Sequence, residues 1–226
     1  MTPAGGSLSF ERIADRYDET RGGENRGRRF AAHLAGMLDP AQPVVEIGVG
    51  TGVVATGLQD LGYRVIGLDL AGGMLARARR RIGPRVAAAD ARRLPLRDGS
   101  VSQALSVWVL HVVGDVAHVL AEVARILSPG GRYLVVPASG DRPQDDPIGA
   151  AIWDMQVRLV HDYEESPAQA IRKIETGSYS ALWDLPGETW RRAVEPTLQE
   201  LRSLPDPDRP IPRRSTDRVV VMGRSS

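Results

Sequence analysis

The sequence predicts an α/β fold with a seven-stranded, mostly parallel sheet, helices on both of its faces and an antiparallel last strand. Three observations carry this prediction. Short apolar runs alternate with amphipathic helical patterns along residues 44–136. The first apolar run ends in a glycine-rich turn at residues 48–52, placed between a strand and a helix. The chain has 226 residues, 42% of them hydrophobic, which is ample to bury a core.

The first predicted strand contains Val44 and Val45 and leads into the run Glu46-Ile47-Gly48-Val49-Gly50-Thr51-Gly52. Gly48 and Gly50 let the backbone turn sharply and let a ligand approach the main chain. The helix that starts near Val53 aims free N–H groups at that ligand. The turn therefore suits a nucleoside-bearing cofactor. A dinucleotide fingerprint would need a third glycine at the position of Val53, so a dinucleotide is not expected.

A short helix is predicted over residues 53–61, and Gly62 terminates it. The strand that follows, residues 64–68, leads into Asp69. A carboxylate at the carboxyl end of the second strand of a βαβ unit is placed to accept hydrogen bonds from ribose hydroxyls. The alternative is that Asp69 only caps the following helix, residues 73–81.

Three further strands complete the parallel part of the sheet, at residues 85–88, 101–109 and 132–136. Asp115 is the predicted N-cap of the helix between the last two. In an open parallel sheet, ligands bind outside the carboxyl ends of the strands. The strand ends should therefore surround one crevice of a Rossmann-like sheet. These ends are Gly48, Asp69, Asp90, Trp108 to His111 and Pro137.

The segments at both ends of the chain are predicted to be accessory to this sheet within a single domain over residues 1–226. Residues 1–38 form a helical cap, with helices over 10–21 and 24–38. Residues 138–177 form a helical insertion, with one helix over 148–175, that shapes the acceptor site. Strand six is expected at 178–185, a helix at 187–204 and the antiparallel strand at 216–222.

The composition of the chain argues against several classes of partner and site. The net charge of +1 argues against a nucleic-acid partner. The absence of cysteine excludes disulfides, thiolate metal sites and cysteine nucleophiles, and no metal is expected. Neither a signal peptide nor a run of eighteen apolar residues is present, so a cytoplasmic protein that does not enter the membrane is expected. A homodimer is compatible with the sequence.

Four motifs together resemble a known family. They are E-x-G-x-G-x-G from Glu46, D-L-A-G-G-M-L from Asp69, D-A-x-x-L-P from Asp90 and L-P-L-x-D-G-S-V from Leu94. Over residues 44–137 the chain resembles the class I S-adenosylmethionine-dependent methyltransferases of type 11, the group that includes ubiquinone and menaquinone biosynthesis enzymes. Two positions depart from the pattern. Ala71 stands where the family usually has Ser, and Ser102 where it often has Asp.

The resemblance implies S-adenosylmethionine as the cofactor, with S-adenosylhomocysteine as the product. It implies that Glu46 organises the turn near the methionyl amine and that Asp90 accepts a hydrogen bond from the adenine amino group. The implied cofactor contacts are Tyr17, Arg21, Glu46, Gly48, Gly50, Gly52, Asp69, Leu70, Met74, Asp90, Ala91 and Trp108. From the residues alone, Met74 could be core filling, Asp90 a turn residue, and Tyr17 and Arg21 packing residues of the cap.

We expect methyl transfer to oxygen of a small molecule, either a secondary metabolite or a quinone-like compound. A hydroxyl, phenol or acidic carbon would benefit from a general base, and His111 lies where the fourth strand delivers side chains to the crevice. The alternative is that His111 is a histidine of the pocket wall. His111, Trp153 and His161 are the predicted acceptor contacts.

Two other functions stay open. One is a tRNA-modifying enzyme of type 11, and the other is a noncatalytic protein of the same fold that serves as a regulatory or assembly partner. Methylation of a nucleic-acid amine is disfavoured, because no Asn-Pro-Pro-Tyr-like turn follows the strand at residues 101–109.

Overall fold

The computed structural model describes residues 18, 23–137, 157–176 and 187–223. These residues fall into two compact units. The first contains the described residues up to Leu159 and from Thr216 onward, and the second runs from Val160 to Ser215. The expectation of a single domain over residues 1–226 stays a prediction, and each unit is described by itself below.

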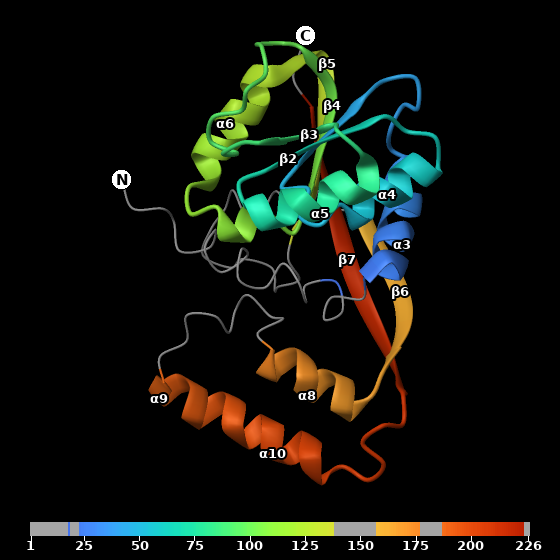
Figure 1. Cartoon of the computed structure of the whole chain (residues 1–226), viewed down its shortest axis with the longest axis vertical. Coiled ribbons are helices and arrows are strands. Elements are labelled where there is room, and N and C mark those ends of the chain that lie inside the picture. Colours follow the sequence, from blue (N-terminus) through green and yellow to red (C-terminus); the bar gives the residue numbers. More distant parts are fainter. Residues whose placement is uncertain (1–17, 19–22, 138–156, 177–186, 224–226) are drawn as a thin grey trace. The chain divides into compact units, whose positions relative to one another are not determined.

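The first unit is built on a parallel sheet (Figure 1). Its parallel strands are β1 (Val44–Ile47), β2 (Val65–Asp69), β3 (Val86–Ala88), β4 (Val101–Val107) and β5 (Leu127–Val136). Strand β7 (Ile211–Gly223) pairs antiparallel with β5, with Val135 opposite Val220. The order of the seven-stranded sheet is β3-β2-β1-β4-β5-β7-β6. The α/β class and the antiparallel last strand are confirmed.

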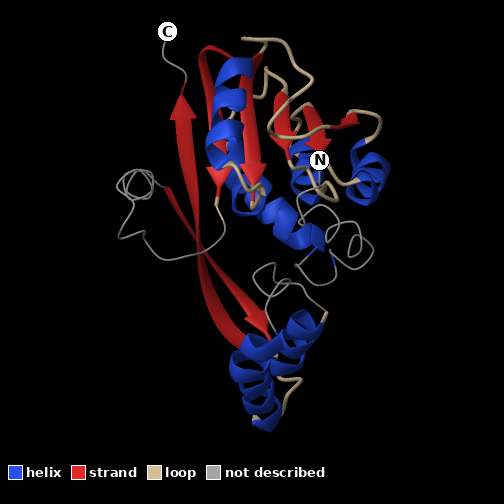
Figure 2. Ribbon diagram, turned by 90° about the vertical axis from the view of Figure 1, so that its left-hand side faces the viewer, coloured by secondary structure: helices blue, strands red, loops and turns tan. Residues whose placement is uncertain are grey.

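Helices cover both faces of this sheet because successive strand residues point to opposite sides. On one face Val44 packs in a core with helices α3 (Gly23–Ala35), α4 (Val53–Asp60) and α5 (Gly72–Ile82). On the other face Val45 packs in a core with α6 (Val116–Ile126). Figures 1 and 2 show α6 across the strands from the other three helices. The sheet is thus buried on both sides, which explains its nearly continuous apolar strands.

The second unit contains helices that follow each other closely along the chain. They are α8 (Pro167–Glu175), α9 (Gly187–Thr189), the π-helical stretch η3 (Trp190–Val194) and α10 (Glu195–Ser203). The predicted helix over 187–204 is confirmed. Strand β6 (Val157–Glu165) leads into this unit, and the first part of β7 belongs to it.

The prediction of one helix over residues 148–175 is wrong where β6 lies. The chain is extended over residues 157–165 and becomes helical only at Pro167. Proline favours an extended residue before it, and in a helix its ring would clash with the carbonyl four residues earlier. Ser166 and Gln169 form a capping box that starts α8 at this point. The 138–177 insertion is therefore not helical throughout.

Some predicted elements lie outside the described residues: the helix at 10–21 and the strand at 178–185. The seventh strand of the sheet is β6 instead. Strand β5 begins at Leu127 rather than at residue 132, because Leu127 already pairs with Val101. The register of the pairing then shifts, and the Pro-Gly-Gly sequence lies within this irregular part of the strand. Within the described residues, no helix is long and apolar enough to cross a membrane.

Candidate functional site

A pocket lies at the carboxyl ends of β1 to β4, where the sequence predicts a crevice. It encloses about 940 Å³ of atom-free space, its open mouth included. The lining residues are Ile47, Gly48, Gly50, Leu68, Asp69, Leu70, Ala71, Met74, Ala89, Asp90, Ala91, Arg92, Leu94, Val107, Trp108, Val109, Val112 and Val113.

The glycines of the turn have different reasons for being glycine, although all three have positive φ. A Cβ on Gly48 would overlap Val109 Cγ2, and one on Gly52 would lie 3.1 Å from Ala78 Cα in α5. A Cβ on Gly50 would meet nothing within 4 Å, and its φ is +54°. Gly50 therefore presents open backbone to the pocket, whereas Gly48 and Gly52 permit close packing. Gly52 does not line the pocket.

Asp69 connects this turn to the start of α5. Its Oδ2 accepts a hydrogen bond from the Gly50 N–H at 2.8 Å, and its Oδ1 accepts one from the Ala71 N–H at 2.9 Å. The N-cap position of α5 belongs to Ala71. Asp69 also lines the pocket, so its carboxylate both supports the turn and lies where a ligand would bind.

Glu46 lies behind the turn and is 2% exposed. Its Oε2 is buried and has no hydrogen-bond partner in the described structure. Burial, and to a lesser degree the charge of Asp69, raises the pKa of the Glu46 carboxyl to about 8. An unpartnered buried carboxyl is costly, and a cationic or hydrogen-bond-donating ligand nearby would relieve that cost.

Replacing Glu46 with Gln should stabilise the protein without ligand and flatten its pH dependence. The folded pKa of about 8 exceeds the ordinary 4.5, so between these values the folded state holds a proton that the unfolded state has released. Stability therefore falls as pH rises through this window, by an amount of the order of a few kcal/mol. Denaturant unfolding at several pH values would measure it. Equal slopes for wild type and Glu46→Gln would contradict this interpretation.

Asp90 begins the loop after β3 and is held by Arg92. Arg92 Nη2 lies 2.6 Å from Asp90 Oδ2, and Arg92 Nε lies 3.0 Å from Oδ1. The Arg92 N–H also donates to Oδ1 at 2.9 Å. The hydrogen bond from the Arg92 guanidinium keeps the pKa of the Asp90 carboxyl below its ordinary value. Sequence reasoning missed Arg92, although an arginine two residues after an aspartate in a loop is a readable signal.

Trp108 and Met74 form apolar parts of the pocket wall. Met74 is 1% exposed, so it is core filling and pocket wall together. Trp108 follows β4 with an unusual left-handed φ of 56°. Its ring packs edge-to-face on Phe30 at 4.7 Å between centroids, and the Arg26 guanidinium lies 3.7 Å from its ring centroid. Helix α3, from the predicted cap, thereby reaches the pocket wall, and sequence reasoning missed Arg26.

The described structure does not place the predicted acceptor contacts at the pocket. His111 is exposed on the 3₁₀ helix η1 (Leu110–Val112) and is not among the pocket-lining residues, whereas its neighbours Val112 and Val113 are. His161 belongs to strand β6. Trp153, like Tyr17 and Arg21, lies outside the described residues. The roles assigned to these residues stay predictions.

The sequence that forms the sheet and the pocket is similar to a known family. A family model described as a methyltransferase domain, of type 11, matches residues 45–135. These residues are less than half of the chain, and over them the chain is similar to methyltransferase domains of type 11. The matched residues contain β2 to β4, all of β1 but its first residue, all of β5 but its last residue, and every residue that lines the pocket. Type 11 is the family whose resemblance implies S-adenosylmethionine as the cofactor.

Relatives of known name extend the comparison. Demethylmenaquinone methyltransferase of Mycolicibacterium gilvum is 37% identical over 130 residues, which cover 56% of this chain and 57% of that protein. The chain therefore spans just over half the length of the curated relatives of this name that it matches. Among solved structures, Haemonchus contortus phosphoethanolamine N-methyltransferase 2 with S-adenosyl-L-methionine aligns with TM-score 0.57 and 17% identity, covering 96% and 57% of the two chains. The [4+2]-cyclase SpnF aligns with TM-score 0.61 and 15% identity, covering 97% and 94%. At such identities the structures support the fold alone.

Proposed function

We propose that this protein transfers a methyl group from S-adenosylmethionine to a small-molecule acceptor. The observation that carries the proposal is the buried Glu46 carboxyl, whose Oε2 has no hydrogen-bond partner among the described residues, in the strand that leads to the open backbone of Gly50. A cofactor with a cationic methionyl amine near this turn would give Glu46 a partner. Asp69 and Asp90, at the ends of the next two strands along the sheet, line the same pocket.

Each residue then has a distinct task. Gly50 admits the cofactor to the backbone, and the Asp69 carboxylate, which lines the pocket, receives the ribose hydroxyls. Asp90 receives the adenine amino group while Arg92 keeps it ionised. Met74 supplies an apolar surface for the adenine ring. When bound, S-adenosylmethionine supplies an electrophilic methyl group, so the protein's main work is to align the acceptor and exclude water.

We propose a quinone-like or phenolic acceptor, methylated on oxygen. The names of the relatives support a quinone-like compound. Apolar side chains that follow Trp108 in the sequence, those of Val109, Val112 and Val113, also line the pocket and suit an apolar ring. A phenolic hydroxyl must lose its proton during transfer, and His111, beside Val112, is the proposed base.

The proposal is tested by incubating the full chain with methyl-labelled S-adenosylmethionine and a panel of quinols, phenols and amines, followed by mass spectrometry. We expect label in a quinol or phenol and the release of S-adenosylhomocysteine. Label that appears only in added tRNA would favour the tRNA-modifying alternative. Cofactor binding with no transfer to any of these acceptors or to a cell extract would favour a noncatalytic role.

Asp69→Ala should weaken cofactor binding by about 1.5–3 kcal/mol, the usual worth of hydrogen bonds to a charged group. The substitution removes the ribose acceptor and leaves the Gly50 and Ala71 N–H groups without their partner. Asp69→Asn should recover part of the loss. Calorimetric titration measures the affinity. A lower melting temperature with wild-type affinity would show that Asp69 serves only the turn and the start of α5.

A further inference from the structure

The loop that follows Asp90, residues 91–100, forms one wall of the pocket but has few backbone hydrogen bonds of its own. Leu94 lines the pocket together with Asp90, Ala91 and Arg92, and it is buried at 4% exposure. Within the loop, the Leu96 N–H donates to the Leu94 carbonyl and the Ser100 N–H to that of Arg97. Such a segment needs support from outside to hold a fixed position.

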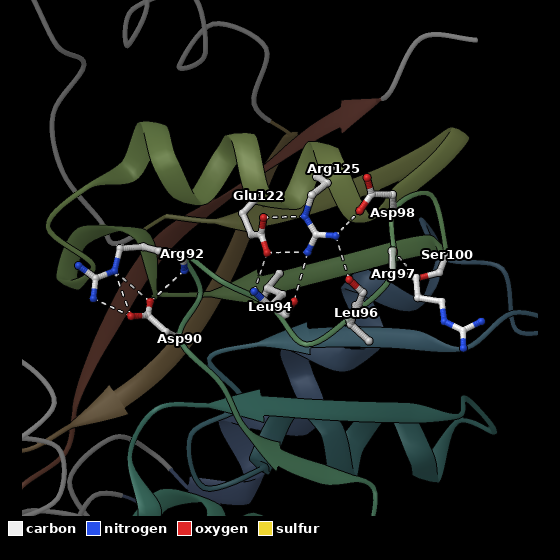
Figure 3. A network of polar contacts seen from close by, with 9 residues as sticks. All are labelled: Asp90, Arg92, Leu94, Leu96, Arg97, Asp98, Ser100, Glu122 and Arg125. Carbon is white, nitrogen blue, oxygen red and sulfur yellow. Dashed lines mark hydrogen bonds and ion pairs between the residues drawn. The ribbon is translucent and has the colours of Figure 1, made fainter.

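That support comes from two side chains of α6, Glu122 and Arg125 (Figure 3). Glu122 Oε1 accepts a hydrogen bond from the Leu94 N–H at 2.6 Å. Arg125 donates to the Leu94 carbonyl at 3.2 Å and to the Leu96 carbonyl at 2.9 Å, and it pairs with Asp98. Both backbone groups of Leu94 are thus bonded to α6. The Gly99 N–H also donates to the Arg125 carbonyl.

Glu122 and Arg125 are bonded to each other as well, one helical turn apart. Arg125 Nε lies 2.8 Å from Glu122 Oε2, and Arg125 Nη2 lies 2.6 Å from Oε1. This two-point pairing fixes the planes of both groups. The Glu122 side chain is 12% exposed and that of Arg125 32%, so the pair is partly shielded from water. The hydrogen bond from Arg125 lowers the pKa of the Glu122 carboxyl, which keeps the pair ionised at neutral pH.

Neither Glu122 nor Arg125 lines the pocket, so both act on it through the loop. Leu94 lies four residues after Asp90, and the Arg93 N–H is bonded to the Asp90 carbonyl. A shift of Leu94 would therefore move the Asp90 carboxylate and the Ala91 N–H. Hydrogen bonds are directional, so such a shift would weaken contacts to a nucleobase edge more than apolar contacts to its face.

We propose that Glu122 and Arg125 are positioning residues. They hold the loop of residues 91–100, which forms the pocket wall beside Asp90, and thereby set the preference of the cofactor site for adenine. The inference rests on the proposed function, because it takes the nucleoside of the cofactor to lie against Asp90. It adds two residues outside the pocket to those that determine which base is accepted.

The experiment compares two ligands by calorimetric titration of the full chain: S-adenosylhomocysteine, and S-inosylhomocysteine, in which a carbonyl oxygen replaces the adenine amino group. Wild type should prefer the adenine compound. Arg125→Ala and Glu122→Ala should weaken binding of the adenine compound by about tenfold or more, since about 1.4 kcal/mol corresponds to tenfold and a buried group left unpaired costs about 1–3 kcal/mol. Binding of the inosine compound should change less, so the preference should shrink.

Conservative variants separate positioning from general stability. Glu122→Gln keeps an oxygen acceptor for the Leu94 N–H and should retain most of the adenine preference, whereas Glu122→Ala should not. Arg202→Ala is the matched control, because Arg202 forms a 2.6 Å ion pair with Glu175 in the second unit and should leave the preference unchanged. If Arg125→Ala does not fold, the comparison of Glu122→Gln with Glu122→Ala still tests the proposal.

Two results would overturn the inference in different ways. Wild-type preference for adenine in Glu122→Ala, together with a lower melting temperature, would reduce the pair to a stabilising role. Equal losses for both ligands would mean that the loop acts on the whole site and not on the base. Failure of wild type to bind either ligand would instead contradict the proposed function.

Discussion

Gly50→Val should abolish binding of S-adenosylmethionine while the protein stays folded. The position has φ +54° and lines the pocket, and an added Cβ would have no protein atom within 4 Å. A branched side chain there would occupy the approach of the cofactor to the backbone. The left-handed backbone costs valine of the order of 1–2 kcal/mol of folding stability, which a domain can sustain. Calorimetric titration measures the binding, and circular dichroism checks the fold.

Gly130→Val is the control for this backbone cost. Gly130 has φ +72° and equally open surroundings, but it does not line the pocket. We expect it to lose similar stability and to bind the cofactor normally. Unchanged affinity in folded Gly50→Val would place the cofactor elsewhere and remove the main support for the proposed function.

The second large effect is expected at His111. A general base contributes roughly a hundredfold to ten-thousandfold to rate, so His111→Ala should lower turnover of a phenolic acceptor by that order. Cofactor affinity should stay nearly unchanged, because His111 is not among the residues that line the pocket. His111→Gln keeps hydrogen bonding without a useful proton acceptor and should be about as slow. Single-turnover rates with labelled cofactor separate chemistry from binding.

His33→Ala is the matched histidine control, since His33 is exposed on α3. It should turn over the acceptor at the wild-type rate. If both His111 variants also reach that rate, His111 has no part in proton transfer. An acceptor that ionises by itself, or an amine, would then fit the reaction better than a phenol.

Much of the first unit could be predicted because its signals are local. The turn from Glu46 to Gly52 marks a strand-to-helix junction, and Asp69 and Asp90 each follow a short apolar run. In a parallel sheet such positions must meet at one edge, and the pocket lies there. The periodicity of apolar residues located the strands and helices around it, apart from the early start of β5 at Leu127.

The contacts between distant segments could not be predicted. Nothing in the spacing of the sequence shows that Arg26 stacks on Trp108, or that Arg125 bonds to the loop around Leu94. These contacts depend on how helices lie across the sheet, which periodicity does not encode. Strand β6 is a different kind of failure. Its apolar residues fit a helical and an extended period equally, but Ser166-Pro167 marked the true start of the helix.

The contact between Gly48 and Val109 has a consequence for how this site can vary. Because a Cβ on Gly48 would overlap Val109 Cγ2, the two positions cannot change independently, although they lie sixty-one positions apart in the sequence. Gly48→Ala should be more damaging in the native background than beside Val109→Ala, and a double-mutant cycle of unfolding free energies would measure this coupling. Alanine keeps some backbone strain at φ +74°, so the relief should be partial. The bulk of Val109, two residues after the end of the neighbouring strand β4, therefore keeps position 48 a glycine, and a larger residue at position 48 requires a smaller one at position 109 first.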